Sequence, residues 1–238
     1  MTEMPRGMIY GVGVGPGDPE LVTVKAARLI FDADLVAYPA PEEGDSFARA
    51  IAGRYMRPEQ REFPIRMKIG DGQFPKDDVY DAAADRLFQA AAAGDLVVVL
   101  CEGDPFFYGS FMYLYARLAS RVRVRVVPGV SSLMACAVAS GGALAAKNDV
   151  LTVVPAPLPE AELKRRLAGS EAAAIIKLGR HLPKVRKVLA ELGLADRARY
   201  VEHATLDSQQ VKMLKDFAGE TAPYFSMLLV HRRGEAWS

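Results

Sequence analysis

Glycines alternate with other residues in a short segment near the start of the chain, residues 11–17, which reads GVGVGPG. Glycine leaves space beside the backbone where a side chain would keep a ligand away. An apolar run precedes this segment, and DPELVT, which is typical of a helix start, follows it. We therefore expect a strand that ends in a ligand-binding turn, the first turn.

The first turn matches neither of two common nucleotide-binding patterns. In the three registers of the dinucleotide fingerprint G-x-G-x-x-G, the third glycine is replaced by Pro16, Asp18 or Glu20. A P-loop needs Gly-Lys-Ser or Gly-Lys-Thr, and neither tripeptide follows. A nicotinamide, flavin or nucleoside triphosphate ligand is therefore disfavoured, and an ordinary tight turn is the alternative.

A second turn, residues 102–110, follows an apolar run and reads EGDPFFYGS. Open α/β sheets bind ligands at the carboxyl ends of their strands. Gly103 frees backbone groups, Asp104 supplies a carboxylate, and Phe107 supplies an aromatic surface. Together they suit a molecule with a polar ribose and a flat base, whereas a helix-entry loop capped by Asp104 is the structural alternative.

A third turn, residues 128–132, reads PGVSS and precedes a helix of small residues. Ser131 or Ser132 can cap that helix. The hydroxyl groups and helix-start amides favour an anionic group such as a carboxylate, by about 0.3 to 1 kcal/mol. Three such turns in one chain favour a binding site over three unrelated loops.

Alternating strand and helix patterns position these turns. Strand-like runs are residues 8–14, 35–38, 62–65, 96–101 and 123–127, and helix-like runs are residues 23–31, 47–55 and 79–93. This alternation predicts a mostly parallel sheet. The run 96–101 is apolar throughout, which is typical of a central strand covered on both faces.

The second half of the chain has a different pattern. We expect strands at residues 150–154, 172–177, 199–203 and 227–231, and helices at residues 160–167 and 183–192. The fold class is therefore α/β with two α/β domains, residues 1–126 and 127–238, of which the first has the mostly parallel sheet.

Composition narrows the range of partners. The 238 residues include 30 basic and 29 acidic ones, a net charge of +1, which argues against a nucleic-acid partner. No run reaches the roughly 18 apolar residues of a membrane span, and the start lacks a signal peptide pattern. We therefore expect a soluble cytoplasmic protein with no membrane partner.

Neither the cysteines nor the histidines form a recognisable site. Cys101 and Cys136 are each embedded in apolar runs, which predicts small buried side chains rather than a disulfide or a zinc site. His181, His203 and His231 are far apart and have no partners at diagnostic spacing. We therefore expect no bound metal and no nucleophilic triad.

The turns GVGPGDPELVT, EGDPFFYGS and PGVSS, in this order and at these separations, resemble those of the tetrapyrrole methylases. These are the class III S-adenosylmethionine-dependent methyltransferases of corrinoid and sirohaem synthesis, and the similarity runs from end to end. The resemblance implies that S-adenosylmethionine is folded into the cleft between two α/β domains. It also implies a homodimer.

The resemblance assigns cofactor contacts to Pro16, Glu102, Gly103, Asp104, Phe107, Ser131, Ser132, Leu178 and Ser226. Pro16 would lie beneath the cofactor, while Leu178 and Ser226 would lie on its adenine side. Glu102 occupies a position where relatives have glycine, which leaves open whether it contributes a side chain or only backbone. We expect Asp104 to orient the cofactor.

The later motifs, among them VAYP, PGVSSLMACAVASGG and PYFS, are most similar to the subgroup that methylates precorrin-2 at C(20) to give precorrin-3A in cobalamin (vitamin B12) biosynthesis. The carboxylates of such a substrate need basic partners. The basic candidates are Arg49, Arg66, Lys68, Lys147, Lys177 and Arg180. We assign substrate binding to Arg66, Lys177 and Tyr108, and Phe111 is a second aromatic candidate for stacking on the macrocycle.

The chemistry requires little of the protein beyond positioning. The sulfonium methyl group is an activated electrophile, and holding it in line with a nucleophilic carbon can supply about 7 to 11 kcal/mol of the barrier. The macrocycle itself provides that carbon, and a proton must leave it afterwards. We therefore name no catalytic residue.

Several alternatives stay open. Within the family, the substrate can be cobalt-precorrin-2 or uroporphyrinogen III, and the sequence barely separates the first of these from precorrin-2. A relative acting on RNA ribose is disfavoured by the near-zero net charge. A regulatory module would bind S-adenosylmethionine without transferring its methyl group, so a turnover assay separates it from an enzyme.

Overall fold

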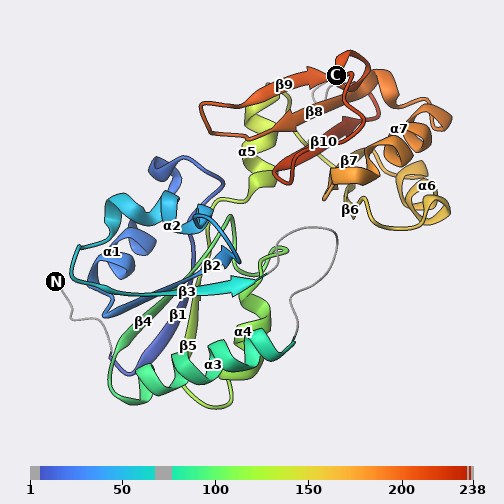
Figure 1. Cartoon of the computed structure of the whole chain (residues 1–238). Coiled ribbons are helices and arrows are strands. Elements are labelled where there is room, and N and C mark those ends of the chain that lie inside the picture. Colours follow the sequence, from blue (N-terminus) through green and yellow to red (C-terminus); the bar gives the residue numbers. More distant parts are fainter. Residues whose placement is uncertain (1–5, 68–76, 235, 237–238) are drawn as a thin grey trace. The chain divides into compact units, whose positions relative to one another are not determined.

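A computed structural model describes residues 6–67, 77–234 and 236 of the chain (Figure 1). The chain divides into two compact units, Met1–Ser131 and Ser132–Ser238, which we call the first and second unit. The boundary that we expected after residue 126 falls inside a strand of the first unit, Val124–Val127. Lys68 lies outside the described residues.

The first unit contains a five-stranded parallel sheet with the strand order β3-β2-β4-β1-β5. Its strands are β1 (Met8–Gly13), β2 (Leu35–Pro41), β3 (Arg61–Met67), β4 (Leu96–Cys101) and β5 (Val124–Val127). β1 and β4 are buried along their whole length, as their uninterrupted apolar sequences predict. The sequence therefore predicted the parallel sheet of this unit correctly.

Helices cover both faces of this sheet (Figure 1). They are α1 (Val24–Asp32), α2 (Phe47–Ala52), α3 (Asp77–Ala92) and α4 (Phe111–Leu118), with short 3-10 helices η1 (Pro19–Leu21) and η2 (Gly53–Tyr55). α1 and α2 pack on one face, and α3 and α4 pack on the other. Ser46 and Thr23 cap α2 and α1 by accepting hydrogen bonds from backbone amides, which fixes where these helices begin.

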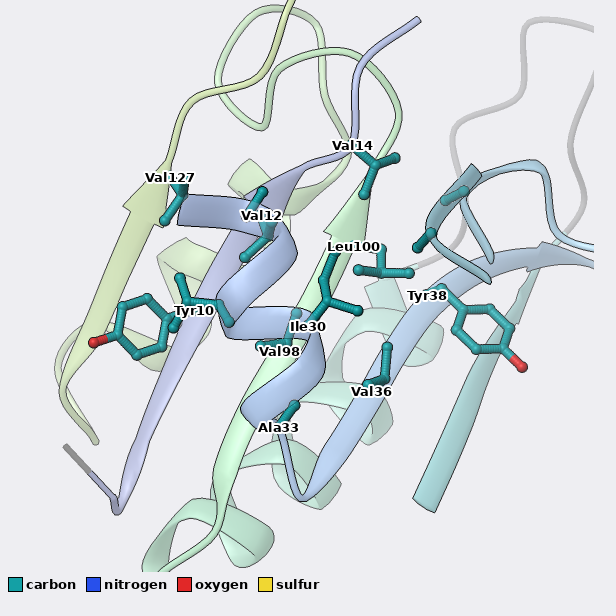
Figure 2. Close-up of a cluster of buried hydrophobic side chains, with 14 of the residues drawn as sticks. Tyr10, Val12, Val14, Ile30, Ala33, Val36, Tyr38, Val98, Leu100 and Val127 are labelled. Carbon is teal, nitrogen blue, oxygen red and sulfur yellow. The ribbon is translucent and has the colours of Figure 1, made fainter. Parts of the chain in front are cut away.

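Alternation along β2 sends neighbouring side chains to opposite faces of the sheet. Val36, Tyr38 and Ala40 belong to the core cluster under α1 and α2, whereas Ala37 belongs to the cluster under α3 and α4. Figure 2 shows the first of these clusters, in which Val36 and Tyr38 lie near Leu100 of β4 and Ile30 of α1.

The second unit contains a mixed five-stranded sheet with the order β6-β7-β10-β8-β9. The strands are β6 (Leu151–Pro155), β7 (Ala172–Ile176), β8 (Ala198–Glu202), β9 (Gln210–Met213) and β10 (Ser226–His231). Among the described strands of this unit, β6 and β7 pair in parallel, and the other pairs are antiparallel. β9 was not predicted, because it has only four residues, QVKM, and these are mostly exposed although polar and apolar residues alternate among them.

Two helices cover one face of the second sheet and one covers the other. The helices are α5 (Ser132–Ala139), α6 (Glu160–Ala168) and α7 (Leu182–Glu191), with short 3-10 helices η3 (Gly179–His181), η4 (Ala195–Arg197) and η5 (Leu214–Asp216). α6 and α7 bury their apolar residues in one cluster, while α5 contributes Leu133 and Cys136 to the cluster on the opposite face.

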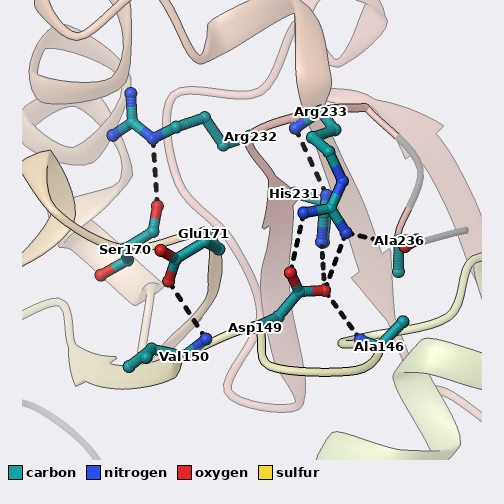
Figure 3. Close-up of polar contacts among 9 residues, drawn as sticks. All are labelled: Ala146, Asp149, Val150, Ser170, Glu171, His231, Arg232, Arg233 and Ala236. Carbon is teal, nitrogen blue, oxygen red and sulfur yellow. Dashed lines mark hydrogen bonds and ion pairs between the residues drawn. The ribbon is translucent and has the colours of Figure 1, made fainter. Parts of the chain in front are cut away.

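An ionic network ties the chain before β6 to the end of β10 (Figure 3). The carboxylate of Asp149 accepts hydrogen bonds from both Nη atoms of Arg233 at 2.8 and 3.0 Å, and from the amide of Ala146 at 2.8 Å. His231 Nε2 lies 3.1 Å from the same carboxylate. These hydrogen bonds, that of Arg233 above all, hold the pKa of Asp149 well below its usual range.

Candidate functional site

Neighbouring strands of the first unit bring the three glycine-bounded turns to one edge of the sheet. β1 lies between β4 and β5 and runs parallel to both, so all three carboxyl ends point the same way. The first and second turns are joined directly, because Gly103 N donates to Gly15 O at 2.8 Å and Gly15 N donates to Gly103 O at 3.3 Å. The turns therefore form one backbone surface.

The glycines of these turns allow the backbones to touch one another. A Cβ atom on Gly13 would lie 2.5 Å from Gly103 O and 2.6 Å from Gly129 N, and one on Gly129 would lie 2.1 Å from Gly103 O. Backbone atoms cannot move aside as a flexible side chain can. Gly13, Gly103 and Gly129 therefore meet at a point where no side chain fits.

Gly11 has a different role from the one that we expected. A Cβ atom there would lie 2.2 Å from the ring of Phe111, so Gly11 makes room for a core side chain rather than for a ligand. Phe111 itself is only 1% exposed and packs in the core cluster of α3 and α4. The expectation that Phe111 stacks on the macrocycle is therefore wrong.

The Asp104 side chain connects the second turn to the third by hydrogen bonds. Its Oδ1 accepts hydrogen bonds from the amides of Phe106 and Phe107 at 2.9 and 3.1 Å, and its Oδ2 accepts one from the amide of Gly129 at 3.1 Å. The carboxylate thus does what a capping residue does and also bridges two turns. Through these bonds Asp104 positions the backbone surface of the turns.

Glu102 is the first residue of the second turn, directly after the central strand β4, and it is partly buried. Burial raises the pKa of its carboxyl group, and hydrogen bonds from the amides of Glu102 and Ala48 oppose that change. The side chain therefore faces the first residues of α2.

Exposed aromatic rings follow Asp104 in the second turn. Phe106, Phe107 and Tyr108 are 50%, 38% and 47% exposed, and we call them the aromatic shelf. The Phe107 and Tyr108 rings are nearly perpendicular, with centroids 5.1 Å apart. Tyr108 has a φ of 57°, in the left-handed region that few non-glycine residues occupy. The shelf is therefore an exposed apolar surface within the second turn.

Three of the other predicted residues lie within the first and third turns, whereas Arg66 lies on another strand of the first unit. Pro16 is buried within the first turn, and Ser131 is half-buried at the end of the third. Ser132 is exposed and is the first residue of α5, in the second unit. Arg66 lies near the carboxyl end of β3 and lines a hollow of about 340 Å³ together with Arg49.

The remaining predicted residues gather at one end of the second sheet. β10 and β7 pair with Met227 opposite Ile176, so Ser226 lies at the end where β7 continues into Lys177 and Leu178. Leu178 is fully buried in the cluster of α6 and α7, and Ser226 donates a hydrogen bond to Pro223 O at 2.6 Å. Lys177 is exposed and has a φ of 58°.

Residues 6–67, 77–234 and 236 contain no group of three or more His, Cys, Asp or Glu side chains that could hold a metal ion. Burial raises the pKa of the Cys101 and Cys136 thiols to about 12, so both are inert small side chains. Across the same part of the chain, no helix combines the length and apolar character needed to cross a bilayer.

The sequence analysis did not predict one polar cluster of the first unit. Tyr38 Oη donates to Glu62 Oε2 at 2.6 Å, and Arg49 donates to both oxygens of the same carboxylate at 3.0 and 3.1 Å. These residues come from β2, β3 and α2, and no spacing pattern connects them. Only the pairing of β2 with β3, with Val36 opposite Glu62 and Tyr38 opposite Pro64, brings them together.

Comparisons of this chain with known proteins agree over most of its length. The family model of the tetrapyrrole (corrin/porphyrin) methylases matches residues 8–217. A precorrin-2 C(20)-methyltransferase from Sinorhizobium sp is 43% identical over 97% of this chain and 97% of its own. A cobalt-precorrin-2 C(20)-methyltransferase from Salmonella typhimurium is 31% identical over 97% of this chain and 98% of its own. A solved uroporphyrin-III C-methyl transferase from Thermus thermophilus, complexed with S-adenyl homocysteine, is 25% identical with a TM-score of 0.69, over 94% of this chain and 97% of that one.

Proposed function

The chain belongs to the tetrapyrrole (corrin/porphyrin) methylases, and on this premise we propose that it transfers a methyl group from S-adenosylmethionine to C(20) of precorrin-2. The product is precorrin-3A, and the reaction is a step of cobalamin biosynthesis. The 43% identity to a precorrin-2 C(20)-methyltransferase, over 97% of both chains, supports this substrate and this position.

The observation that carries the proposal is the contact of the three turns at Gly13, Gly103 and Gly129. This contact fixes backbone groups of three strand ends as one rigid surface, which is the kind of preorganised site that positions a donor. The aromatic shelf adjoins it in sequence and offers flat apolar area to an adenine or a pyrrole ring.

We assign methyl-donor contacts to Pro16, Glu102, Gly103, Asp104 and Phe107 in the first unit. Ser131, Ser132, Leu178 and Ser226 complete the assignment. The hydrogen bond from Ser226 to Pro223 holds the Ser226 side chain in place, which suits a fixed contact with adenine. The donor supplies an electrophilic methyl group, and these residues bind the donor and exclude water from it.

An isotope experiment tests the proposed reaction. The protein is incubated without oxygen with precorrin-2 and S-adenosylmethionine labelled with carbon-13 in its methyl group, and the product is analysed by NMR. We expect one new methyl signal, attached to C(20). A label at another carbon would refute the position, and release of no S-adenosylhomocysteine in the presence of precorrin-2 would favour a module that binds the donor without catalysis.

Cobalt-precorrin-2 is the second candidate substrate, because the Salmonella typhimurium relative that carries this name is 31% identical over nearly the whole chain. The greater identity to the precorrin-2 enzyme favours the metal-free substrate. Turnover with the two substrates, measured side by side at equal concentration, separates these candidates by the ratio of their kcat/KM values.

We propose further that the protein is a homodimer, as its membership of the family implies. We also propose that it works in the cytoplasm. Sedimentation at micromolar concentration is the test of assembly, since the chain has a mass of 25.8 kDa. A species of twice that mass is expected. A species of the monomer mass alone would refute the dimer.

A further inference from the structure

A hollow of about 340 Å³ lies at the carboxyl ends of β2 and β3, in the first unit. The residues that line it are Tyr38, Ala40, Gly44, Asp45, Ser46, Arg49, Ala50, Pro64 and Arg66. Ala40 lies opposite Arg66 and Tyr38 opposite Pro64 in the pairing of the two strands. The hollow is therefore on the same face of the sheet as α2.

Arg49 is neutralised within this hollow. Its Nε and Nη2 atoms donate to the two oxygens of Glu62 at 3.1 and 3.0 Å, which is a bidentate ion pair. Tyr38 donates to the same carboxylate at 2.6 Å. The hydrogen bonds from Arg49 keep the pKa of Glu62 below its usual range, so this carboxylate stays charged and Arg49 stays paired.

Arg66 is held differently. Its Nη1 atom donates to the backbone oxygens of Pro41 at 2.8 Å and Glu42 at 3.3 Å, which orient the guanidinium without cancelling its charge. Among the described residues, no carboxylate forms an ion pair with Arg66. Asp45 lines the same hollow and supplies an opposing charge from an exposed position.

The hollow lies on the same edge of the sheet as the three turns. β2 separates β3 from β4, whose end begins the second turn, and adjacent strands are about 4.8 Å apart. The end of β3 is thus about 10 Å from the end of β4 along the sheet. A substrate whose reacting carbon faces the donor at the turns needs to reach only two strands further to enter the hollow.

We infer that this hollow receives a carboxylate arm of the substrate and that Arg66, not Arg49, is its ionic anchor. The inference rests on the proposed function, since a polycarboxylate macrocycle is the ligand class that it requires. Guanidinium groups recognise carboxylates through paired hydrogen bonds, and Arg66 is held by backbone oxygens without an ion pair among the described residues. Arg49, Glu62 and Tyr38 form the fixed neutral wall beside it.

The test compares Arg66→Met with Arg61→Met, which removes the same charge from the opposite end of β3. Precorrin-2 turnover is measured for both variants, and S-adenosylmethionine affinity is measured by calorimetry. For Arg66→Met we expect KM for precorrin-2 to rise roughly 10- to 100-fold, the cost of a lost charged hydrogen bond, with donor affinity unchanged. The KM of Arg66→Lys should lie between those of Arg66→Met and wild type, and the KM of Arg61→Met should equal that of wild type.

An unchanged KM in Arg66→Met would overturn the inference and leave Arg66 as a residue that only fixes the turn after β2. A second variant, Asp45→Asn, leaves Arg66 intact. Because it removes the opposing charge, it should lower KM for precorrin-2 about 2- to 3-fold. If Arg66→Met does not fold, an unchanged KM in Asp45→Asn would overturn the inference instead. Failure of the proposed function is distinct, because wild type itself would then not methylate precorrin-2.

Discussion

The three turns of the first unit and the hollow beside them occupy one edge of one sheet, but they are built from different parts of the chain. At the turns, backbone atoms of Gly13, Gly103 and Gly129 touch, and a Cβ atom has no room. At the hollow, side chains of Arg49, Glu62 and Arg66 make the contacts. A backbone site is fixed by the fold itself, whereas a site made of side chains can change its specificity without changing the fold.

The largest effect is expected from a substitution at the turns. Gly129→Ala puts a Cβ atom 2.1 Å from Gly103 O, which backbone movement must relieve, so we expect a loss of about 2 to 4 kcal/mol in the free energy of unfolding. Urea unfolding measures this loss. Gly169→Ala is the matched control, because no atom lies within 4 Å of a Cβ atom there. Equal stability of the two variants would contradict the backbone contact.

Asp104→Ala should have the next largest effect. The variant loses the acceptor for the amides of Phe106, Phe107 and Gly129, which costs about 1 to 3 kcal/mol of stability. Because the turns then lose their mutual register, we expect affinity for S-adenosylmethionine in calorimetry to fall about 10-fold or more. Wild-type affinity in Asp104→Ala would show that the turns do not position the donor.

Glu62→Gln should change the charge at the hollow and leave the fold intact. The pair with Arg49 is partly exposed, so at pH 7 we expect a loss of only about 0 to 1 kcal/mol of stability. Since the pKa of Glu62 is lowered in the folded state, its contribution is present above the pKa of the unfolded chain and disappears as the pH falls through the folded value. The gap between wild type and Glu62→Gln should therefore close in acid.

Denaturation at pH 7 and at pH 3 measures this gap. Release of Arg49 also adds a free cation to the hollow, so KM for precorrin-2 should fall slightly in Glu62→Gln. A stability gap that widens in acid would contradict the ion pair.

The smallest effect is expected from thiol labelling of the native protein. Cys101 ends β4 directly before the second turn, and burial raises the pKa of its thiol to about 12. In a Cys136→Ala background, a thiol reagent at pH 8 should therefore leave Cys101 unmodified while labelling unfolded protein fully. Addition of Gly129→Ala should speed the labelling if the turns loosen. Rapid labelling of the native Cys136→Ala protein would show that this edge of the sheet opens readily.

Much of the local structure followed from the sequence. The uninterrupted apolar run 96–101 predicted a covered central strand, and the turns at residues 11–17 and 102–110 were placed at strand ends because glycine and proline interrupt the apolar pattern there. The strand β9 was missed because its alternating pattern is only four residues long, and pairing with its neighbour β8 holds it in the sheet.

The sequence by itself determined the α/β class, the parallel first sheet and the family, because each depends on short patterns of residues that lie close along the chain. The tertiary structure alone decided what these residues touch. It placed the Asp104 carboxylate on Gly129, the Phe111 ring against Gly11, and Glu62 on Arg49 rather than Arg66. Such contacts join residues far apart in the chain, and their geometry follows from strand order and register, which no single segment encodes.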